Sequence, residues 1–505
     1  MARIVVIGAG VGGLGTALCA ARTGHSVTVV ERDDTPLPAD PHGAFEWDRR
    51  GAPQVRHSHA FLARLRNLLR DRHPDVLAAL LAAGATEMRF TEMAPEGMDI
   101  IPEPGDEDLV GIAVRRTTFE WVLRRLASAE GDVELVHGTA AEALRTVRDP
   151  LGPGTPRVIG VELADGSTVD ADVVVAAGGR RNDVPALLAP HGITVAETTD
   201  DTGIVYLSRF FRLVDGAELP PRSGVIGGDL GYLKYGVFPG DNRTFSITFA
   251  VGTHDSELRK ALLDDDTFIT AASLIVPTAP YVDGRSEPIT GVEVMGGLIN
   301  RSRRFLDDDG RPVVLGLHAV GDAHTATNPL YGRGCSLAMV QAQLLADLLD
   351  EPLTDHDPDS AHEGVAAAHF ARAIAYEAAV ESEITPWYRA AVTQDRFARQ
   401  AEGTAPDDAG PDGTVDPSDF VRELLRDGLL PAMRTDPVVL RAFLRTFNLL
   451  NPPDSLMNDP DLIGRVMTAY QDRDNRPPEP EMGPDRAGFF TAVRAPRHPP
   501  ASRHV

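Results

Sequence analysis

The chain has 505 residues, 43% of them apolar, and a formal net charge of −25 at pH 7. The length is too great for one simple core, and the negative charge argues against a nucleic-acid partner or an anionic membrane surface. No apolar stretch is long enough to span a bilayer, and two cysteines, Cys19 and Cys335, build no disulfide framework, so a cytoplasmic location is expected.

The N-terminal segment has the pattern of a strand, a glycine turn, a helix and a second strand. Residues 4–7 are β-branched and apolar, and Gly8, Gly10 and Gly13 follow at G-x-G-x-x-G spacing. The first glycine permits the turn, the second lets a pyrophosphate approach the backbone, and the third lets the helix pack on the strand. The helix N-terminus favours phosphate charge, and Glu31, which ends the second strand, can accept hydrogen bonds from ribose hydroxyls. The segment predicts a dinucleotide site.

The middle of the chain predicts a sheet-rich unit inserted into the nucleotide unit. Strand patterns with alternating residues run from about 202 to 297, and a buried strand at 313–320 then completes the first unit. We expect an α/β fold: a Rossmann-like domain, an inserted mixed or antiparallel β-sheet domain and a C-terminal helical region. The expected bounds are 1–190 with 300–350 for the first, 191–299 for the second, 351–475 for the third, and a flexible tail at 476–505.

A second informative segment begins at Gly321. Asp322 directly follows the predicted buried strand, where a carboxylate can reach polyol hydroxyls. Pro329, Gly332 and Gly334 form a turn that brings backbone amides close to a ligand, and a helix begins at Cys335. The N-terminus of that helix would stabilise the anionic edge of a reduced flavin.

Together these two segments resemble the FAD-dependent monooxygenase superfamily with the fold of p-hydroxybenzoate hydroxylase. GAPQVRHSHAFLARL (51–65) and RTTFEWVLRRLA (116–127) are similar to the branch that holds polyether epoxidases and related natural-product oxygenases. The resemblance covers about residues 1–350. It implies that the N-terminal glycines and Glu31 hold the ADP half of FAD, that Asp322 binds the ribityl chain, and that Gly332 and Gly334 lie against the isoalloxazine. Arg56 and Arg116 match arginine positions near the flavin. The candidate cofactor-binding residues are Gly8, Gly10, Gly13, Glu31, Arg32, Arg56, Arg116, Asp322, Pro329, Gly332, Gly334 and Cys335.

One motif departs from the family pattern. The family has an Asp-Gly pair after the strand equivalent to residues 172–177, whereas this chain has Gly178 and Gly179 followed by Arg180. No second G-x-G-x-x-G with a following acid is found. Reduction would therefore use transient docking of NAD(P)H or an external flavin reductase as a partner.

The substrate side is less well defined. His57 and His59 are either flavin neighbours or hydrogen-bonded residues at a helix start, and His324 is a further candidate two residues after Asp322. Tyr235 and Phe238 line a substrate cavity or belong to an ordinary core. No set of side chains has metal-ligand spacing, and no catalytic side chain is assigned.

The resemblance implies a flavoprotein oxidoreductase: a monooxygenase that inserts one oxygen atom of O2 into an organic small molecule. Hydroxylation or epoxidation would proceed through a flavin C4a-hydroperoxide, and antibiotic biosynthesis is an expected setting. Three alternatives stay open. A reductase of isoprenoid or lipid double bonds resembles geranylgeranyl reductases at Phe238-Pro239. A flavin-dependent halogenase is disfavoured because no lysine precedes Lys234. An inactive flavin-binding partner protein would fit the missing acid at Gly178.

Overall fold

The computed structural model describes residues 1–494 except 96, 149–153, 182–183, 222–226, 351–360, 402, 404–416, 473, 476–477 and 479. Its first unit is a parallel sheet of order β18-β9-β1-β2-β5. The strands span Leu317–Ala319, Val173–Ala176, Arg3–Ile7, Ser26–Glu31 and Val133–His137. Strand β18 is shorter than the expected buried strand at 313–320, and it lies beside β9 although Ala176 and Leu317 are 141 positions apart in the sequence. This confirms the interleaved Rossmann-like unit.

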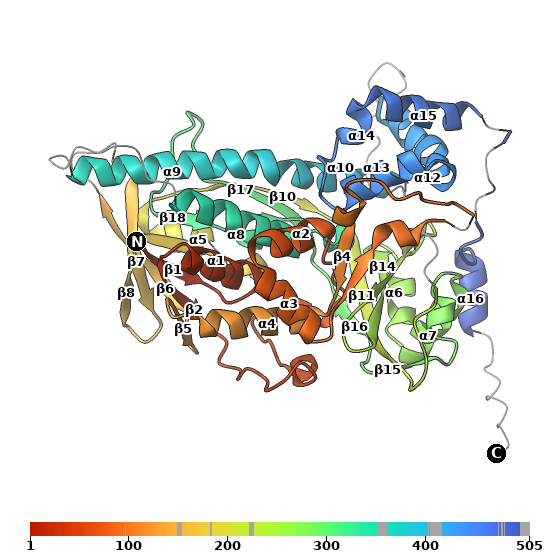
Figure 1. The fold of residues 1–505 in the computed structure, drawn as a ribbon, viewed down its shortest axis with the longest axis horizontal. Helices are drawn as coiled ribbons and strands as arrows, with labels where there is room; N and C mark the ends of the chain where they lie inside the picture. The colour runs from red at the N-terminus through yellow and green to blue at the C-terminus, as the bar shows by residue number, and fades with distance from the viewer. Residues whose placement is uncertain are drawn as a thin grey trace.

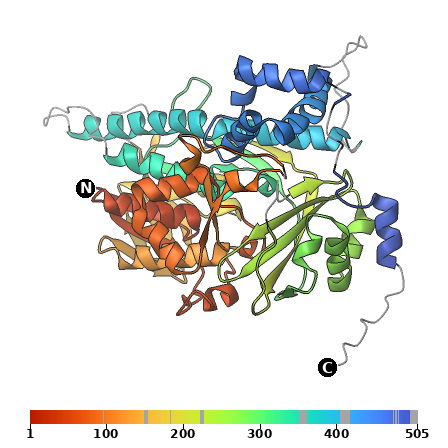
Figure 2. The same ribbon diagram turned by 45° about the vertical axis from the view of Figure 1, so that its right-hand side comes forward.

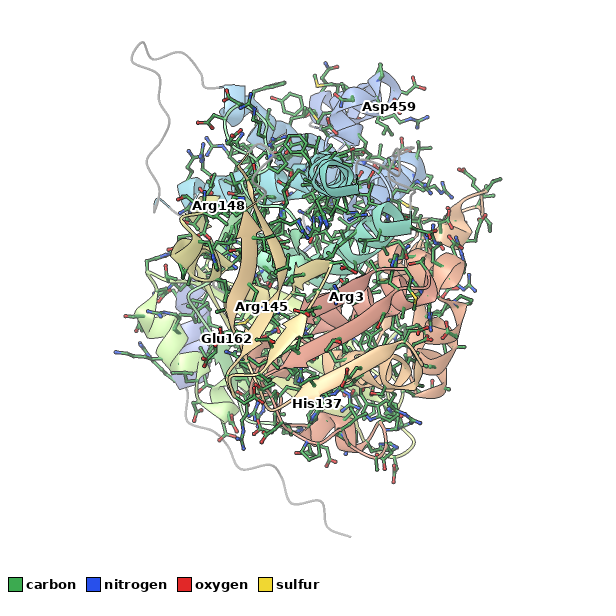
Figure 3. The ribbon with its side chains drawn as sticks, turned by 90° about the vertical axis from the view of Figure 1, so that its left-hand side faces the viewer. Arg3, His137, Arg145, Arg148, Glu162 and Asp459 are labelled. Carbon is green, nitrogen blue, oxygen red and sulfur yellow. The ribbon has the colours of Figure 1, made fainter. Side chains whose placement is uncertain are left out.

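Two layers cover this sheet. One face packs on helices in a core that joins Ile4 and Val6 to Leu14 and Leu123. The helices are α1 (Val11–Arg22), α2 (Ala63–Arg72), α3 (Pro74–Ala82), α4 (Arg116–Ala129) and α8 (Gly334–Asp350). The other face, through Val5, packs on an antiparallel sheet of β6 (Ala141–Arg148), β7 (Pro156–Leu163) and β8 (Thr168–Asp170), which Figure 3 shows from the side that carries Arg145 and Glu162. Helix α5 (Val184–Leu188) also packs on this face, and β3 (Thr86–Arg89) pairs with β4 (Val110–Ala113).

The second large sheet has the order β12-β13-β14-β11-β15, and β16 pairs with β11 at another point. These strands span Gly227–Asp229, Lys234–Pro239, Thr244–Gly252, Ile204–Leu213, Ser286–Pro288 and Glu293–Met295. Helices α6 (Ser256–Leu262), α7 (Asp265–Leu274) and α16 (Arg486–Arg494) cover one face, as the right-hand side of Figure 1 shows. The opposite face turns toward the first unit, where Ser58 hydrogen-bonds to Ser246 at 2.7 Å.

A third, antiparallel sheet of β10 (Ala196–Asp201), β17 (Ile299–Arg304) and β19 (Thr325–Ala326) leads to the C-terminal helices. The long helix α9 (Ala361–Glu383) runs along α8, and α10 (Thr385–Ala401) continues across β17 (Figures 1 and 2). The remaining helices are α11 (Pro417–Leu424), a π-helix (Leu425–Leu429), α12 (Leu430–Thr435), α13 (Pro437–Phe447), α14 (Ser455–Asn458) and α15 (Pro460–Gln471). Among the described residues, no helix is both long and apolar enough to cross a membrane.

The expected fold class, an α/β protein with an inserted sheet and C-terminal helices, is therefore confirmed. Residues 495–505 of the predicted tail lie outside the described residues. The described residues before them include α16, whose Phe489 is fully buried against the second sheet.

Candidate functional site

Three turns meet at one edge of the parallel sheet. Strands β1, β9 and β18 are parallel neighbours, so their carboxyl ends lie side by side at Gly8, Gly178 and Gly321. Gly8 has φ +105°, and a Cβ built on it would lie 2.8 Å from the Cα of Gly178. The two turns thus touch backbone to backbone, which leaves no room for a side chain on Gly8.

The two remaining motif glycines have different reasons to be glycine. A Cβ on Gly13 would overlap the carbonyl oxygen of Gly8, so α1 can pack on β1 only without a side chain there. A Cβ on Gly10 would meet no described atom within 4 Å, and its φ of −86° suits any residue. Among the described residues no side chain caps the N-terminus of α1. The open space at Gly10 and the uncapped helix fit a phosphate group.

The N-terminal segment and the segment that begins at Gly321 lie side by side. A Cβ on Gly12 would be 3.5 Å from the side chain of Val320 and 3.7 Å from the Cβ of Ala338 on α8. The Asp322 side chain is 29% exposed, and its Oδ1 would lie 4.0 Å from a Cβ on Gly334, the first residue of α8. The Asp322 carboxylate therefore lies beside the start of α8, within the same group of turns as Gly8.

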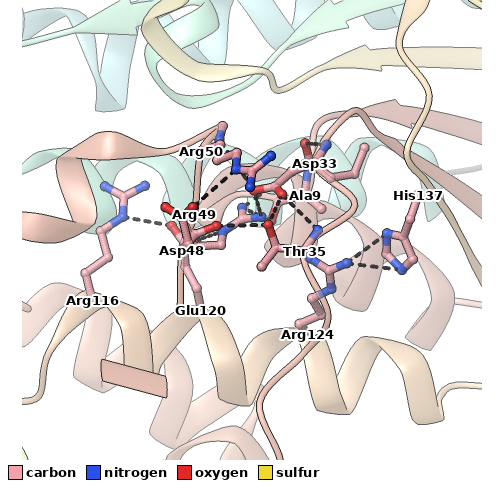
Figure 4. Close-up of polar contacts among 12 residues, drawn as sticks. Ala9, Asp33, Thr35, Asp48, Arg49, Arg50, Arg116, Glu120, Arg124 and His137 are labelled. Atoms are coloured by element: carbon pink, nitrogen blue, oxygen red, sulfur yellow. Dashed lines mark hydrogen bonds and ion pairs between the residues drawn. The ribbon is translucent and has the colours of Figure 1, made fainter. Parts of the chain in front are cut away.

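Glu31 lies at the end of β2 and is 6% exposed. Its carboxylate accepts hydrogen bonds from the backbone N–H of Ala9 at 2.8 Å and of Asp33 at 3.0 Å. The Arg49 guanidinium lies 3.8 Å from Glu31 and donates to the carbonyl oxygen of Ala9 at 3.1 Å. Figure 4 shows Arg49 among these groups, together with Glu120 from α4. Arg49 and Glu120 were not predicted from the sequence.

A chain of charged groups connects Glu31 to the start of α8. Arg49 donates to one oxygen of Glu120 at 3.2 Å, and Arg116 donates to the other at 2.8 Å. Burial opposes the ionisation of Glu120, but Arg116 and Arg49 hold the pKa of this carboxyl below its ordinary value. Arg116 also lies 3.8 Å from the sulfur of Cys335. The predicted residues Glu31, Arg116 and Cys335 thus belong to one continuous polar array.

The two histidines of the first loop contact different parts of the site. His57 lies 3.1 Å from the hydroxyl of Ser208 on β11, and burial lowers its pKa to about 4. His59 Nδ1 faces the carbonyl oxygen of His57 at 2.9 Å, and its Nε2 faces Arg116 at 3.1 Å. Because the carbonyl only accepts and Arg116 only donates, the proton of His59 belongs on Nδ1. Burial and Arg116 lower the pKa of His59, so the ring is neutral.

The other candidates are less close to this array. Arg32 is exposed beyond β2, and Arg56 is exposed and lies 3.4 Å from Glu293. His324 is 2% exposed and lies 3.2 Å from Glu377 of α9. Tyr235 lies in the core beneath α6 and α7, on the far face of the sheet, and burial raises its pKa to about 12. Phe238 is half-buried and pairs with Ser246 on the face toward the first unit, opposite to that of Tyr235.

Arg333 was not predicted and stands between Gly332 and Gly334. It is 6% exposed, and its guanidinium lies 4.9 Å from the ring centre of Tyr331 and 4.8 Å from that of Trp387. Nε and Nη1 have no hydrogen-bond partner among the described residues, and burial lowers the pKa of Arg333 to about 10. A charged residue between two glycines of the turn was the one sequence signal that could have identified it.

Helix α10 holds this turn in place through Asp395. Its carboxylate accepts hydrogen bonds from Tyr331 at 2.7 Å, from Asn328 at 2.7 Å and from Asn300 at 2.6 Å. Burial raises the pKa of Asp395. A Cβ on Gly332 would lie 2.7 Å from the Cβ of Ala60, so the first loop closes over the same turn.

Comparison with known proteins agrees with this architecture. Residues 3–77 match the family described as FAD dependent oxidoreductase, and no curated protein sequence matches the chain. PqsL, a probable FAD-dependent monooxygenase from Pseudomonas aeruginosa, aligns with a TM-score of 0.51 at 19% identity over 80% of this chain and 100% of its own. OxyS anhydrotetracycline hydroxylase from Streptomyces rimosus aligns with a TM-score of 0.53 at 18% identity, and the alignment covers 89% of this chain and 76% of OxyS. CmlS, a flavin-dependent halogenase, aligns with a TM-score of 0.56 at 18% identity, and the alignment covers 86% of this chain and 74% of CmlS. The fold is thus the one these flavin-dependent proteins share.

Proposed function

We propose that the chain is a FAD-dependent monooxygenase that inserts one oxygen atom of O2 into an organic small molecule, by hydroxylation or epoxidation. The observation that carries the proposal is the open, uncapped turn at Gly10. The fold alone does not require glycine at this position, whereas a pyrophosphate against the start of α1 does.

The residues of the site fit FAD along one line. Gly10 and the start of α1 would hold the pyrophosphate, and the oxygens of Glu31 would accept from ribose hydroxyls. Asp322 would bind the ribityl chain, since its partly exposed carboxylate lies beside the start of α8. Arg333 brings unpaired N–H groups to the turn on which the isoalloxazine would lie. When bound, FAD would supply the redox chemistry and the activation of O2.

The protein would orient the substrate and exclude water. The face of the second sheet that carries Ser208 and Phe238 turns toward the loop of His57 and His59, so we propose that the substrate lies between them. The neutral ring of His59 would hold Arg116 in position rather than transfer a proton, because its pKa is far below neutral pH. We further propose that residues 1–190 with 300–350 bind FAD, that 191–299 bind the substrate, and that the chain acts in natural-product oxidation like the polyether epoxidase branch.

The electron donor would be NAD(P)H or the product of an external flavin reductase. Gly178 supplies no carboxylate, and the nearby Arg180 pairs with Asp322 instead. A transient nicotinamide contact or a partner reductase are both compatible with this arrangement.

Reduction of the purified protein with NADPH, with NADH and with a flavin reductase, each in air, tests the proposal. A yellow protein that is reduced by one of these donors and consumes O2 on substrate addition is expected. A colourless preparation that takes up no FAD would contradict it. Anaerobic turnover would favour the double-bond reductase, bromide- or chloride-dependent product would favour the halogenase, and a yellow protein inert to every donor would favour the inactive partner protein.

A further inference from the structure

A separate cavity of about 130 Å³ lies where the first loop, the start of α4 and strand β11 meet. Phe45, Trp47, Arg115, Thr117 and Phe210 line it, and Arg56 and Glu293 form an ion pair at its edge. A water molecule in the liquid occupies about 30 Å³, so the cavity has room for a small organic molecule. Of the residues proposed to bind FAD, only Arg56 contributes to its lining.

Three buried polar atoms of this lining are left without partners. The indole Nε1 of Trp47, Nη1 of Arg115 and the hydroxyl of Thr117 have no hydrogen-bond partner among the described residues. Each of the three residues is 5% exposed or less. A buried polar group without a partner costs about 1–3 kcal/mol, and such groups are rare in native proteins. These three come from residues that line one small cavity, which favours a polar ligand there.

The chemistry of these groups defines one end of that ligand. An indole N–H and a guanidinium can only donate, so the ligand must present an acceptor oxygen to them. The other nitrogens of Arg115 are bound to Asp241, at 2.9 Å from Nε and 2.5 Å from Nη2, which fixes the guanidinium so that Nη1 stays free. The side chain of Arg115 does not cap α4, and the carboxylate of Asp241 accepts a hydrogen bond from the backbone N–H of Arg115 at 2.9 Å.

The rest of the lining is mixed, with one apolar wall and the polar side chains of Glu46 and Thr290 beside the Arg56–Glu293 pair. The rings of Phe45 and Phe210 meet edge to face with their centres 5.7 Å apart, and Val55 and Ile289 complete the wall. We propose that this cavity binds a small carboxylic acid with an apolar body, its carboxylate toward Trp47, Arg115 and Thr117 and its body against the two phenylalanines. The cavity borders the proposed substrate region, since Phe210 lies on the same face of β11 as Ser208, but the binding of the acid is measured without turnover and does not depend on the proposed oxygenation.

Titration of the purified protein with sodium benzoate and with sodium hexanoate tests this site, followed by calorimetry and by the fluorescence of the tryptophans. At least one of the two is expected to bind with a Kd of about 1 mM or lower. Benzyl alcohol, which keeps the ring but lacks the carboxylate, is expected to bind at least about tenfold more weakly, since hydrogen bonds to charged groups are the stronger ones.

Two variants assign the binding to this cavity. Thr117→Val keeps the shape of the side chain, and Trp47→Phe keeps an aromatic ring. Each substitution is expected to weaken the binding of the acid about tenfold, because one hydrogen bond to the carboxylate is lost. Thr139→Val is the control, because the buried hydroxyl of Thr139 also has no hydrogen-bond partner among the described residues but does not line the cavity. FAD content should stay unchanged in Thr117→Val. The proposal is overturned if neither acid binds, if benzyl alcohol binds as tightly, or if Thr117→Val binds like the control.

Discussion

Arg180 donates a hydrogen bond from Nε to Oδ2 of Asp322 at 3.1 Å and another from Nη2 to the carbonyl oxygen of Thr327 at 2.6 Å. The first bond joins residues 142 positions apart in the sequence. It connects the turn after β9, which contains Gly178, to the turn after β18. The positive charge of Arg180 therefore orients the carboxylate that we propose for the ribityl chain.

Replacement of Asp322 tests this assignment. Asp322→Ala is expected to lower FAD affinity at least about tenfold, since a carboxylate hydrogen bond to a hydroxyl is lost, and to leave the fold intact. Absorbance of bound flavin and the melting temperature measure the two effects. Asp308→Ala, which removes a fully exposed carboxylate paired with Arg304, is the control. Unchanged flavin content in Asp322→Ala would remove Asp322 from the site.

The glycine motif gives a sharper comparison. Gly10→Ala should lower FAD affinity while the flavin-free protein loses less than about 1 kcal/mol of stability, the cost of alanine at a helix N-cap. Gly13→Ala should destabilise the protein by about 3 kcal/mol or prevent folding, because its Cβ overlaps Gly8. Gly131→Ala is the control, since its Cβ would meet no described atom. Normal FAD binding by Gly10→Ala would argue against the phosphate site.

Arg333 is expected to tune the flavin. Arg333→Met keeps most of the volume and removes a buried charge with unpaired nitrogens, so the flavin-free protein should be as stable or more stable. Loss of the positive charge should lower the two-electron reduction potential of bound FAD by about 30 mV, which corresponds to about 1.4 kcal/mol. Spectroelectrochemistry measures the potential, with the exposed Arg304→Met as control. An unshifted potential would place the guanidinium away from the flavin.

Stability should fall in mild acid. Burial lowers the pKa of His57 to about 4 and that of His318 to about 3, so both stay neutral in the folded protein while they take up protons in the unfolded chain near pH 6.5. Each of these two histidines should therefore lower the free energy of unfolding by about 2 kcal/mol at pH 5 relative to pH 7. The loss begins as the pH drops below the unfolded pKa.

Chemical denaturation at the two pH values measures this effect. In His57→Gln, the difference in the free energy of unfolding between pH 5 and pH 7 should be smaller by about 2 kcal/mol, the contribution of one histidine. In His42→Gln, which changes an exposed ring, that difference should stay the same. An identical pH dependence in His57→Gln and the wild type would contradict the assignment.

The sequence predicted the local structure around the candidate site, because a glycine turn and the helix that follows it are specified by neighbouring residues. The helix after the N-terminal glycines and the turn after β18 are examples. Arg49, Glu120 and Arg180 could not be predicted, since each acts through a partner far away in the chain. The sequence predicts a shared environment for Tyr235 and Phe238, either a substrate cavity or an ordinary core. These residues are three positions apart on one strand, so the pleat puts them on opposite faces. Strand β11 is buried on almost every residue because both of its faces are covered.

The hydrogen bonds that the Asp395 carboxylate accepts have a consequence for the synthesis of the chain. Asn328 and Tyr331 donate hydrogen bonds from the turn to a carboxylate more than sixty residues downstream. Before α10 has left the ribosome, the nascent chain contains the glycine motif but not the Asp395 carboxylate that holds the turn. If FAD binds at this turn as proposed, its stable binding would require the chain through residue 395, and premature termination before that residue would leave the turn without the Asp395 carboxylate.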